Sequence, residues 1–254
     1  MTTPARVAFV TGAARRIGRA IVEDLAANGW RVAIHYNRSR NDAERLAAEI
    51  TAAGGRALPV QADLGDAGAL PAAIAAATEA LGPPSLLVNN ASMFESDRGG
   101  ALERERFDRQ MAVNLTAPIF LTEAFAAALP AAVEGNVVNI IDQSVWKPTP
   151  RHFSYQLSKV ALWEATRMLA QSLAPRIRVN AIAPGPTLRH AAQTDAEFAA
   201  RLETVLLRRG PELAEFGRTI RYFVENRSVT GQMIGLDGGQ HLAWETPDVA
   251  DLDD

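Results

Sequence analysis

The 254-residue chain contains no cysteine, and this absence removes several chemistries at once. Disulfides, thiolate nucleophiles and cysteine-ligated metals are excluded. The histidines, His35, His152, His190 and His241, are far apart in sequence and form no HExxH pattern, so we expect no bound metal. An excess of one charge is also lacking, because 26 basic and 29 acidic residues give a net charge of −3. We therefore expect neither a nucleic acid nor a membrane surface as a partner.

Long hydrophobic runs are absent as well. The amino-terminal sequence MTTPARVAFV has too short an apolar run for a signal peptide. No apolar stretch approaches the roughly 20 residues that are needed to span a bilayer. With 48% hydrophobic and 22% charged residues the composition is that of an ordinary globular protein, and we expect a cytoplasmic location.

Short apolar runs alternate with longer helical patterns along the whole chain. Runs typical of strands lie at 6–10, 31–36, 56–63, 86–90, 136–141, 177–184 and around 232–237. Helical patterns lie at 17–28, 41–53, 69–81, 105–129, 155–173 and 211–226. Runs that are apolar throughout indicate strands buried on both faces, and their alternation with helices predicts a parallel sheet with helices on both sides. The predicted fold is one doubly wound α/β domain over residues 1–254, with about seven strands.

Two segments stand apart from this alternation. The polar segment at about 186–210 follows Pro184, Gly185 and Pro186, and we expect it to be mobile. The acidic tail at about 245–254, ETPDVADLDD, is expected to be loosely held. No linker rich in proline, glycine or serine is long enough to split the chain into two domains.

A glycine-containing turn, VTGAARRIGRA at 10–20, joins the first predicted strand to the first helix. Gly12 permits a tight turn, and Gly18 lets helix and backbone approach closely. Backbone N–H groups at the start of the helix would then face an anion. The glycine pair alone is also compatible with an ordinary βα turn, but its place in the first βα unit favours a dinucleotide site.

The end of the second predicted strand distinguishes NAD from NADP. An NAD site usually has an acid here, which binds the ribose 2′-hydroxyl. This chain instead reads HYNRSR, His35 to Arg40, with no acid. Arg38 and Ser39 offer a cation and a hydroxyl to a 2′-phosphate, and Arg16 adds positive charge, so NADPH is favoured over NADH. The alternative for the RSR sequence is a solvated basic turn.

Tyr155 and Lys159 are four residues apart, on one face of a predicted helix. A nearby ammonium lowers the pKa of a phenol and makes proton exchange feasible, as a hydride-transfer enzyme requires. Taken alone, such a pair is more often structural. Asp142 stands thirteen residues before Tyr155. An ionised carboxylate only accepts hydrogen bonds and would oppose a developing alkoxide, so it suits a substrate with N–H groups or a C=N bond whose nitrogen takes the proton.

Several motifs in order resemble the short-chain dehydrogenase/reductase family over nearly the whole chain. They are TGAARRIG (11–18), Asp63, NNAS (89–92), Asn114, YQLSK (155–159) and PG (184–185). The resemblance implies a single Rossmann-type domain, usually in a tetramer, with an Asn–Ser–Tyr–Lys catalytic set. It also implies that Asn114 positions a water chain near Lys159, and that Lys159 holds the nicotinamide ribose.

Two positions depart from the family pattern. Arg16 replaces the middle glycine of the turn, and Asp142 stands where the catalytic serine is expected. Ser144 comes two residues too late for that role, unless a local shift brings it in.

The same departures are found in the subgroup of pteridine reductases and bacterial dihydromonapterin/dihydrofolate reductases, which this chain resembles. The likeness also rests on HYNRS (35–39), VNNASMF (88–94) and NLTAP (114–118). It implies that Asp142 and Tyr155 handle protons, and that the aromatic residue, here Phe94, stacks on the pterin. Phe94 is also compatible with a core aromatic, and Asp142 with a turn cap. Trp146 either walls the substrate pocket or merely packs.

We therefore predict an NADPH-dependent reductase of a dihydropteridine of the dihydromonapterin, dihydrobiopterin or dihydrofolate type, in a homo-oligomer. A general carbonyl reductase acting on a ketone, sugar or 3-oxoacyl substrate, and a non-catalytic NADP-binding sensor, remain alternatives. The expected catalytic residues are Asp142, Tyr155, Lys159 and Asn114, and the expected substrate contacts are Arg16, Ser92, Phe94, Asp142, Trp146 and Tyr155. The expected cofactor contacts are Gly12, Arg16, Ile17, Gly18, His35, Tyr36, Asn37, Arg38, Ser39, Asp63, Leu64, Asn90, Ala91, Ser92, Tyr155, Lys159, Pro184 and Gly185.

Overall fold

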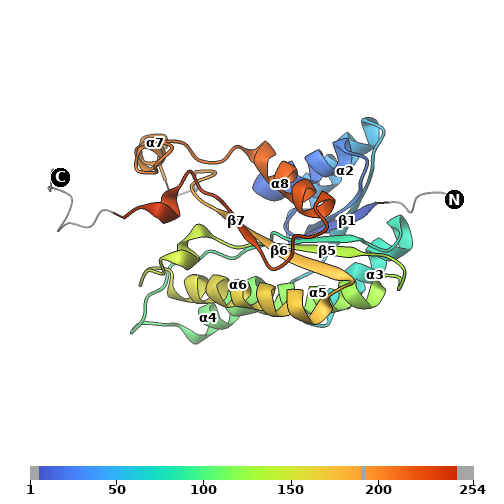
Figure 1. Cartoon of the computed structure of the whole chain (residues 1–254), viewed down its shortest axis with the longest axis horizontal. Coiled ribbons are helices and arrows are strands. Elements are labelled where there is room, and N and C mark those ends of the chain that lie inside the picture. The colour runs from blue at the N-terminus through green and yellow to red at the C-terminus, as the bar shows by residue number, and fades with distance from the viewer. Residues whose placement is uncertain (1–5, 190–192, 245–254) are drawn as a thin grey trace.

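A parallel sheet forms the centre of the computed structural model, which describes residues 6–189 and 193–244 (Figure 1). Its seven strands within these residues follow the order β3-β2-β1-β4-β5-β6-β7. The strands are β1 (Val7–Val10), β2 (Arg31–Tyr36), β3 (Arg56–Gln61), β4 (Leu86–Asn89), β5 (Gly135–Ile140), β6 (Ile177–Pro184) and β7 (Met233–Leu236). The predicted doubly wound α/β fold is confirmed, and the order reverses between β1 and β4, where such folds bind their ligands.

Helices cover both faces of the sheet (Figure 1). One face carries α1 (Arg16–Ala27), α2 (Arg40–Ala52) and α8 (Leu213–Glu225), and the other carries α3 (Ala69–Leu81), α4 (Arg104–Met111), α5 (Ala117–Ala128) and α6 (Phe153–Leu173). Within β1, Ala8 and Val10 belong to the core under α1 and α8, whereas Val7 and Phe9 belong to the core under α3 and α5. This alternation explains why the strands are apolar throughout.

The predicted helix at 105–129 is interrupted by a π-helical segment, Ala112–Thr116, between α4 and α5. Such segments are rare and frequently mark functional sites. Asn114 lies at its centre and is fully buried. The sequence analysis predicted one continuous helix here and did not detect the π turn.

By length and hydropathy, the helical run Arg104–Ala128 is the one within the described residues that could cross a membrane, contrary to the expectation from sequence. Its apolar residues Ala117, Leu121 and Phe125 are instead fully buried in the core beneath the sheet. The run is therefore a core helix of this domain.

The polar segment at 186–210 contains a helix that the sequence analysis did not assign, α7 (Asp195–Glu203). Thr194 and Glu197 form a reciprocal capping box at its start. The two ends of the segment meet, since a Cβ on Gly210 would lie 1.9 Å from the carbonyl oxygen of Pro186. Mobility of this segment stays a prediction, while His190 and the acidic tail at 245–254 lie outside the described residues.

A chain of polar side chains crosses the buried interior beneath the sheet. Asn89 Nδ2 on β4 donates to Asn139 Oδ1 on β5 at 2.8 Å, and Asn139 Nδ2 donates to Thr166 Oγ1 on α6 at 2.8 Å. Buried polar groups are costly unless paired, so this chain fixes α6 relative to the ends of β4 and β5.

The contact between α1 and α8 depends on Gly217. A Cβ at this position would lie 2.3 Å from Asp24 Cγ on α1, and the Asp24 carboxylate also pairs with Arg221 Nε at 2.9 Å. A side chain at residue 217 would therefore push the two helices apart and break this ion pair.

We predict that Gly217→Leu lowers the free energy of unfolding by about 1–3 kcal/mol, the usual cost of overpacking. The measurement is the midpoint of urea-induced unfolding. Ala214→Leu adds a leucine at an exposed position on the same helix and serves as the control. Equal midpoints for the two variants would show that the close approach of α1 and α8 has no energetic weight.

Candidate active site

Asp142 and Tyr155 meet where β5 ends and α6 begins. Asp142 follows β5 and precedes a 3₁₀ turn, Gln143–Trp146, and Tyr155 lies in the first turn of α6. The Tyr155 hydroxyl donates to Asp142 Oδ2 at 2.8 Å. The tyrosine is only 7% exposed, so this hydrogen bond lies in a largely dry environment. The sequence prediction that an acid lies beside the phenol agrees with this geometry.

The second carboxylate oxygen of Asp142 is used by the following turn. Asp142 Oδ1 accepts from the Ser144 backbone N–H at 2.8 Å and from the Ser144 hydroxyl at 2.6 Å. Asp142 therefore also caps the turn, as the alternative interpretation predicted, through the oxygen that does not face Tyr155. The Ser144 hydroxyl is therefore a hydrogen-bond partner of Asp142, as is the Tyr155 hydroxyl on the other oxygen.

Tyr155 has a pKa raised well above its ordinary value, first by burial and then by the Asp142 charge and hydrogen bond. This is the reverse of the lowering by Lys159 that the sequence analysis predicts. Lys159 Nζ lies 5.8 Å from the Tyr155 ring centroid and donates to the Ile140 carbonyl at 2.8 Å. Because the nearest charge to the phenol is the carboxylate, Tyr155 stays protonated and is a proton donor in this state.

Lys159 is itself buried, and burial lowers its pKa to about 8 although Asp142 opposes this shift. A group with this pKa exchanges protons in the physiological range. Its hydrogen bond to Ile140 places the ammonium against the end of β5, beneath the Asp142–Tyr155 pair.

Asn114 joins the loop after β4 to α6. Its Oδ1 accepts from the Met93 N–H at 2.7 Å and from the Ser92 hydroxyl at 3.3 Å. Its Nδ2 donates to the Met93 carbonyl at 2.8 Å and to Ser158 Oγ at 3.2 Å. The amide therefore holds the NNASMF loop in place, and its predicted role in a water chain stays a prediction.

Phe94 projects from that loop over the tyrosine. Its ring is 45% exposed, so the alternative of a core aromatic is wrong. It stacks on the His152 ring with 4.3 Å between centroids, and meets the Tyr155 ring edge-on at 4.7 Å. The loop is tied to the start of α6 by Asp97, whose carboxylate accepts from the Ser154 N–H at 3.1 Å and from the Ser154 hydroxyl.

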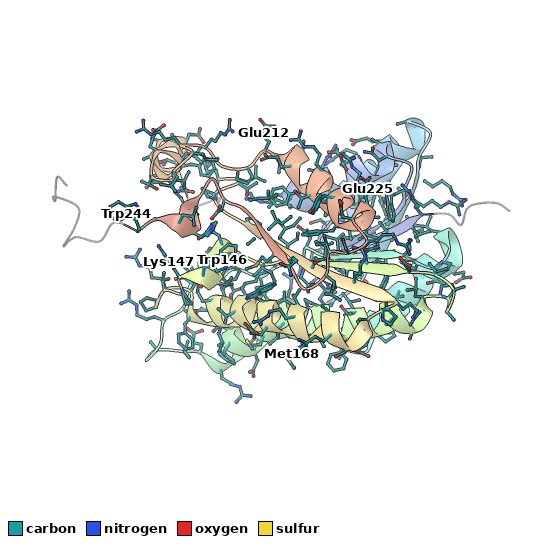
Figure 2. All side chains as sticks on the ribbon, viewed as in Figure 1. Trp146, Lys147, Met168, Glu212, Glu225 and Trp244 are labelled. Atoms are coloured by element: carbon teal, nitrogen blue, oxygen red, sulfur yellow. The ribbon has the colours of Figure 1, made fainter. Side chains whose placement is uncertain are left out.

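Trp146 ends the 3₁₀ turn that follows Asp142, and its side chain, labelled in Figure 2, is 40% exposed. Its ring contacts the His241 ring with 4.4 Å between centroids, and His241 Nδ1 lies 2.6 Å from the buried Asp237 carboxylate. Trp146 therefore packs against the carboxy-terminal turn while it keeps a solvent-facing surface.

The glycine turn borders a cavity of about 460 Å³. A Cβ on Gly12 would lie 2.9 Å from Ala91 Cα, and one on Gly18 would lie 2.3 Å from the Gly12 carbonyl oxygen, so both positions exclude a side chain. The predicted cofactor residues that line this cavity are Gly12, Arg16, Ile17, Gly18, His35, Asn37, Leu64, Asn90, Ala91 and Ser92. Arg15, Met93 and Val113 also line it, and the sequence analysis missed them.

Arg16 occupies a position that the family usually gives to glycine, and its backbone retains the glycine-like conformation. Its φ is +53°, in the left-handed region that costs a side-chain-bearing residue about 1–2 kcal/mol. Its guanidinium donates to the Arg189 carbonyl at 3.2 Å and to the Leu188 carbonyl at 3.4 Å. Arg16 thus connects the phosphate turn to the start of the 186–210 segment.

His35 supports the turn from below. The imidazole is buried, its Nδ1 accepts from the Gly12 N–H at 3.1 Å, and its Nε2 lies 3.2 Å from the Ala62 carbonyl oxygen. Burial lowers the pKa of His35 to about 4, so the ring is neutral and carries its proton on Nε2. His35 therefore has a structural role in addition to its predicted contact with the cofactor.

A second cavity, lined by further residues predicted to contact the cofactor, lies beside the first. Arg38 and Asp63 line a neighbouring cavity of about 500 Å³, which shares Asn37 with the first. Ser39 precedes α2, whereas Tyr36 is buried in the core and does not line either cavity. The arginine is exposed and forms no ion pair with the described residues, so its guanidinium is available to an anion.

These features fit a dinucleotide. The glycine turn lets backbone approach a pyrophosphate, and the paired cavities run from the turn to Arg38. Asp142 and Tyr155 do not line either of these two cavities. Pro184 and Gly185 end β6, where the Gly185 N–H donates to the Leu236 carbonyl at 2.8 Å and joins the β6 end to β7. Within the described residues no cluster of histidine, aspartate or glutamate is suited to a metal ion.

Comparison with known proteins agrees with this site. The model of the short chain dehydrogenase family matches residues 6–199. The structure of the FolM alternative dihydrofolate reductase 1 of Brucella suis in complex with NADP is 58% identical, covers 98% of this chain and 100% of that chain, and has a TM-score of 0.94. Pteridine reductase 1 of Leishmania tarentolae is 32% identical, over 95% of this chain and 98% of that protein.

The 3-oxoacyl-[acyl-carrier-protein] reductase of Synechocystis sp. (strain ATCC 27184 / PCC 6803 / Kazusa) is 31% identical, over 92% of this chain and 96% of that protein. These relatives act on different substrates, so the family alone does not select one. The match over most of the chain, together with the observed fold and turn, shows that this chain belongs to the short chain dehydrogenase family.

Proposed function

We propose that this protein is an NADPH-dependent reductase of a dihydropteridine of the dihydrofolate, dihydromonapterin or dihydrobiopterin type. The observation that carries the proposal is the 2.8 Å hydrogen bond from Tyr155 to Asp142, because it puts a carboxylate where a ketone reductase needs a hydroxyl donor. The likeness to the dihydrofolate reductase of Brucella suis and to pteridine reductase 1 supports the same substrate class.

The bound cofactor would supply a hydride to the carbon of a C=N bond, with Gly12, Gly18 and Arg38 holding its phosphates. Tyr155 donates a proton to the nitrogen of that bond. Asp142 accepts from N–H groups of the ring and holds the tyrosine hydroxyl in place. Lys159, whose pKa is lowered to about 8 by burial, supplies a proton from beneath the pair when the tyrosine has lost its own.

Phe94 supplies a flat, partly exposed ring next to Tyr155. A pterin lying against it gains stacking energy on the order of 1 kcal/mol. Ser92 and Arg16 line the neighbouring cavity beside the glycine turn and offer a hydroxyl and a cation to the ring substituents. Trp146, in the turn after Asp142 and packed against the His241 ring, would wall the pocket there.

A carbonyl reductase is the second candidate function, and the likeness to a 3-oxoacyl reductase favours it. Against it, the Ser144 hydroxyl donates its hydrogen bond to Asp142. Of the hydroxyls of Ser144 and Tyr155, only that of Tyr155 is then left to donate to a substrate carbonyl. A non-catalytic sensor has no need of a buried tyrosine that is hydrogen-bonded to a carboxylate and has a buried lysine one helical turn away. A cytoplasmic location and a tetrameric assembly are further proposals that rest on the family resemblance.

Tyr155→Phe removes the proton donor while it keeps the ring under Phe94. We expect kcat to fall at least about 10²-fold, the usual scale of acid–base catalysis, with NADPH affinity nearly unchanged. Oxidation of NADPH followed at saturating dihydropteridine gives kcat, and fluorescence titration gives the affinity. Tyr222→Phe, on exposed α8, is the control; unchanged turnover in Tyr155→Phe would contradict the assignment.

Asp142→Ser tests the substrate class. In the native enzyme we expect NADPH oxidation with dihydropteridines and little with a panel of ketones. In the variant we expect kcat/KM for the dihydropteridine to fall about 10²-fold, and ketone turnover to rise, because the repulsion of an alkoxide is removed. Asp142→Asn keeps the shape of the side chain and removes its charge. It therefore distinguishes the effect of the charge from that of the turn cap. Ketone turnover without dihydropteridine turnover in the native enzyme would remove the proposal.

Arg38→Ala tests the cofactor preference. We expect the ratio of kcat/KM for NADPH to that for NADH to fall about tenfold, the scale of one charge-assisted hydrogen bond. Arg40→Ala, a neighbouring exposed arginine that pairs with Glu44 at 3.6 Å, is the matched control. An unaltered ratio in Arg38→Ala would exclude this residue from 2′-phosphate recognition.

A further inference from the structure

The segments that carry Phe94 and His152, here called the rim, place two arginines opposite each other. Arg98 and Arg151 form an isolated antiparallel bridge between the loop after β4 and the segment before α6. Residues directly opposite each other in such a pair have Cβ atoms about 5 Å apart on the same face, and like charges in this arrangement are destabilising. Both residues are exposed. The bridge therefore concentrates positive charge on a protein whose net charge is −3.

The neighbouring carboxylates do not neutralise this pair. Glu95 Oε2 lies 3.3 Å from Arg106 Nε, and Asp97 accepts hydrogen bonds from Ser154 at the start of α6. Among the described residues neither Arg98 nor Arg151 has an ion-pair partner within 4.0 Å. The acidic residues of the loop are thus occupied by structural contacts, and the two guanidinium groups can bind an external anion.

The bridge lies close in sequence to residues that are expected to contact the substrate. Arg151 directly precedes His152, whose ring stacks on Phe94 at 4.3 Å. Arg98 lies four residues after Phe94, within about 13 Å along an extended chain. Pro148 and Pro150 restrict the backbone before Arg151, so its position is pre-organised. Lys147, labelled beside Trp146 in Figure 2, adds a third cation four residues before Arg151.

We propose that Arg98 and Arg151 form an anionic-tail site, which binds the carboxylates of a substrate whose pterin ring lies against Phe94. This inference rests on the proposed function and narrows it. A dihydropteridine with a benzoyl-glutamate tail, as in dihydrofolate, carries carboxylates beyond its ring, whereas dihydromonapterin and dihydrobiopterin carry neutral hydroxylated side chains. Arginine pairs recognise carboxylates by two parallel hydrogen bonds, so the rim selects the tailed substrate.

Steady-state kinetics of the Arg98→Gln/Arg151→Gln variant with two substrates tests this site. We expect KM for dihydrofolate to rise about fivefold to tenfold, the scale of one or two solvent-exposed ion pairs, with kcat unchanged. KM for the neutral dihydrobiopterin should stay within about twofold of the native value. The difference between the two substrates should shrink as ionic strength rises, because salt screens exposed charges.

Arg56→Gln/Arg167→Gln removes the same charge at exposed positions outside the rim and is the matched control. Arg98→Lys/Arg151→Lys keeps the charge and should recover part of the affinity for dihydrofolate. An unchanged KM for dihydrofolate in the glutamine variant, or an equal rise for both substrates, would overturn the anionic-tail site and leave the proposed function standing. A native enzyme that reduces neither dihydropteridine would overturn both.

Discussion

A buried phenol that donates to a partly buried carboxylate is the contact on which the rest of the site depends. Removing the Asp142 charge in part from water is costly unless the carboxylate receives hydrogen bonds. It receives them from Tyr155, from the Ser144 N–H and from the Ser144 hydroxyl. The same carboxylate raises the pKa of Tyr155, together with burial, and so keeps the proton on the phenol. A site built in this way donates a proton from Tyr155 and accepts hydrogen bonds from N–H groups through Asp142. Reduction of a C=N bond in a pterin uses both, whereas a ketone has no N–H group to offer.

The surrounding structure keeps these two side chains in register. The buried chain from Asn89 through Asn139 to Thr166 links β4 and β5 to α6, and Asp97 ties the substrate loop to the start of that helix. On the cofactor side, Arg16 holds a strained left-handed backbone, and its guanidinium bonds to the Leu188 and Arg189 carbonyls. Strain of this kind persists only where neighbouring contacts compensate for it, and it is concentrated at functional sites.

The elements and the proton-transfer pair were predictable from the sequence, because both depend on local patterns. Apolar runs define strands buried on two faces, and Asp142, Tyr155 and Lys159 lie within 18 residues of one another. The pKa of Tyr155 was predicted in the wrong direction, since it depends on which charge lies nearer after folding. His35 beneath Gly12, the π turn at Asn114 and the bridge between Arg98 and Arg151 depend on contacts between distant segments, which no local pattern reports. The helix α7 was not predicted, because its capping box lies in a short polar stretch without apolar periodicity.

The most direct measurement of the central claim is a crystal structure of the ternary complex with NADP and a pterin. The account predicts that Asp142 Oδ2 and the Tyr155 hydroxyl both lie within about 3.2 Å of ring nitrogens or their N–H substituents, with the ring against Phe94. A pterin bound away from Asp142, with the Ser144 hydroxyl or an ordered water facing the reacting atom, would contradict it.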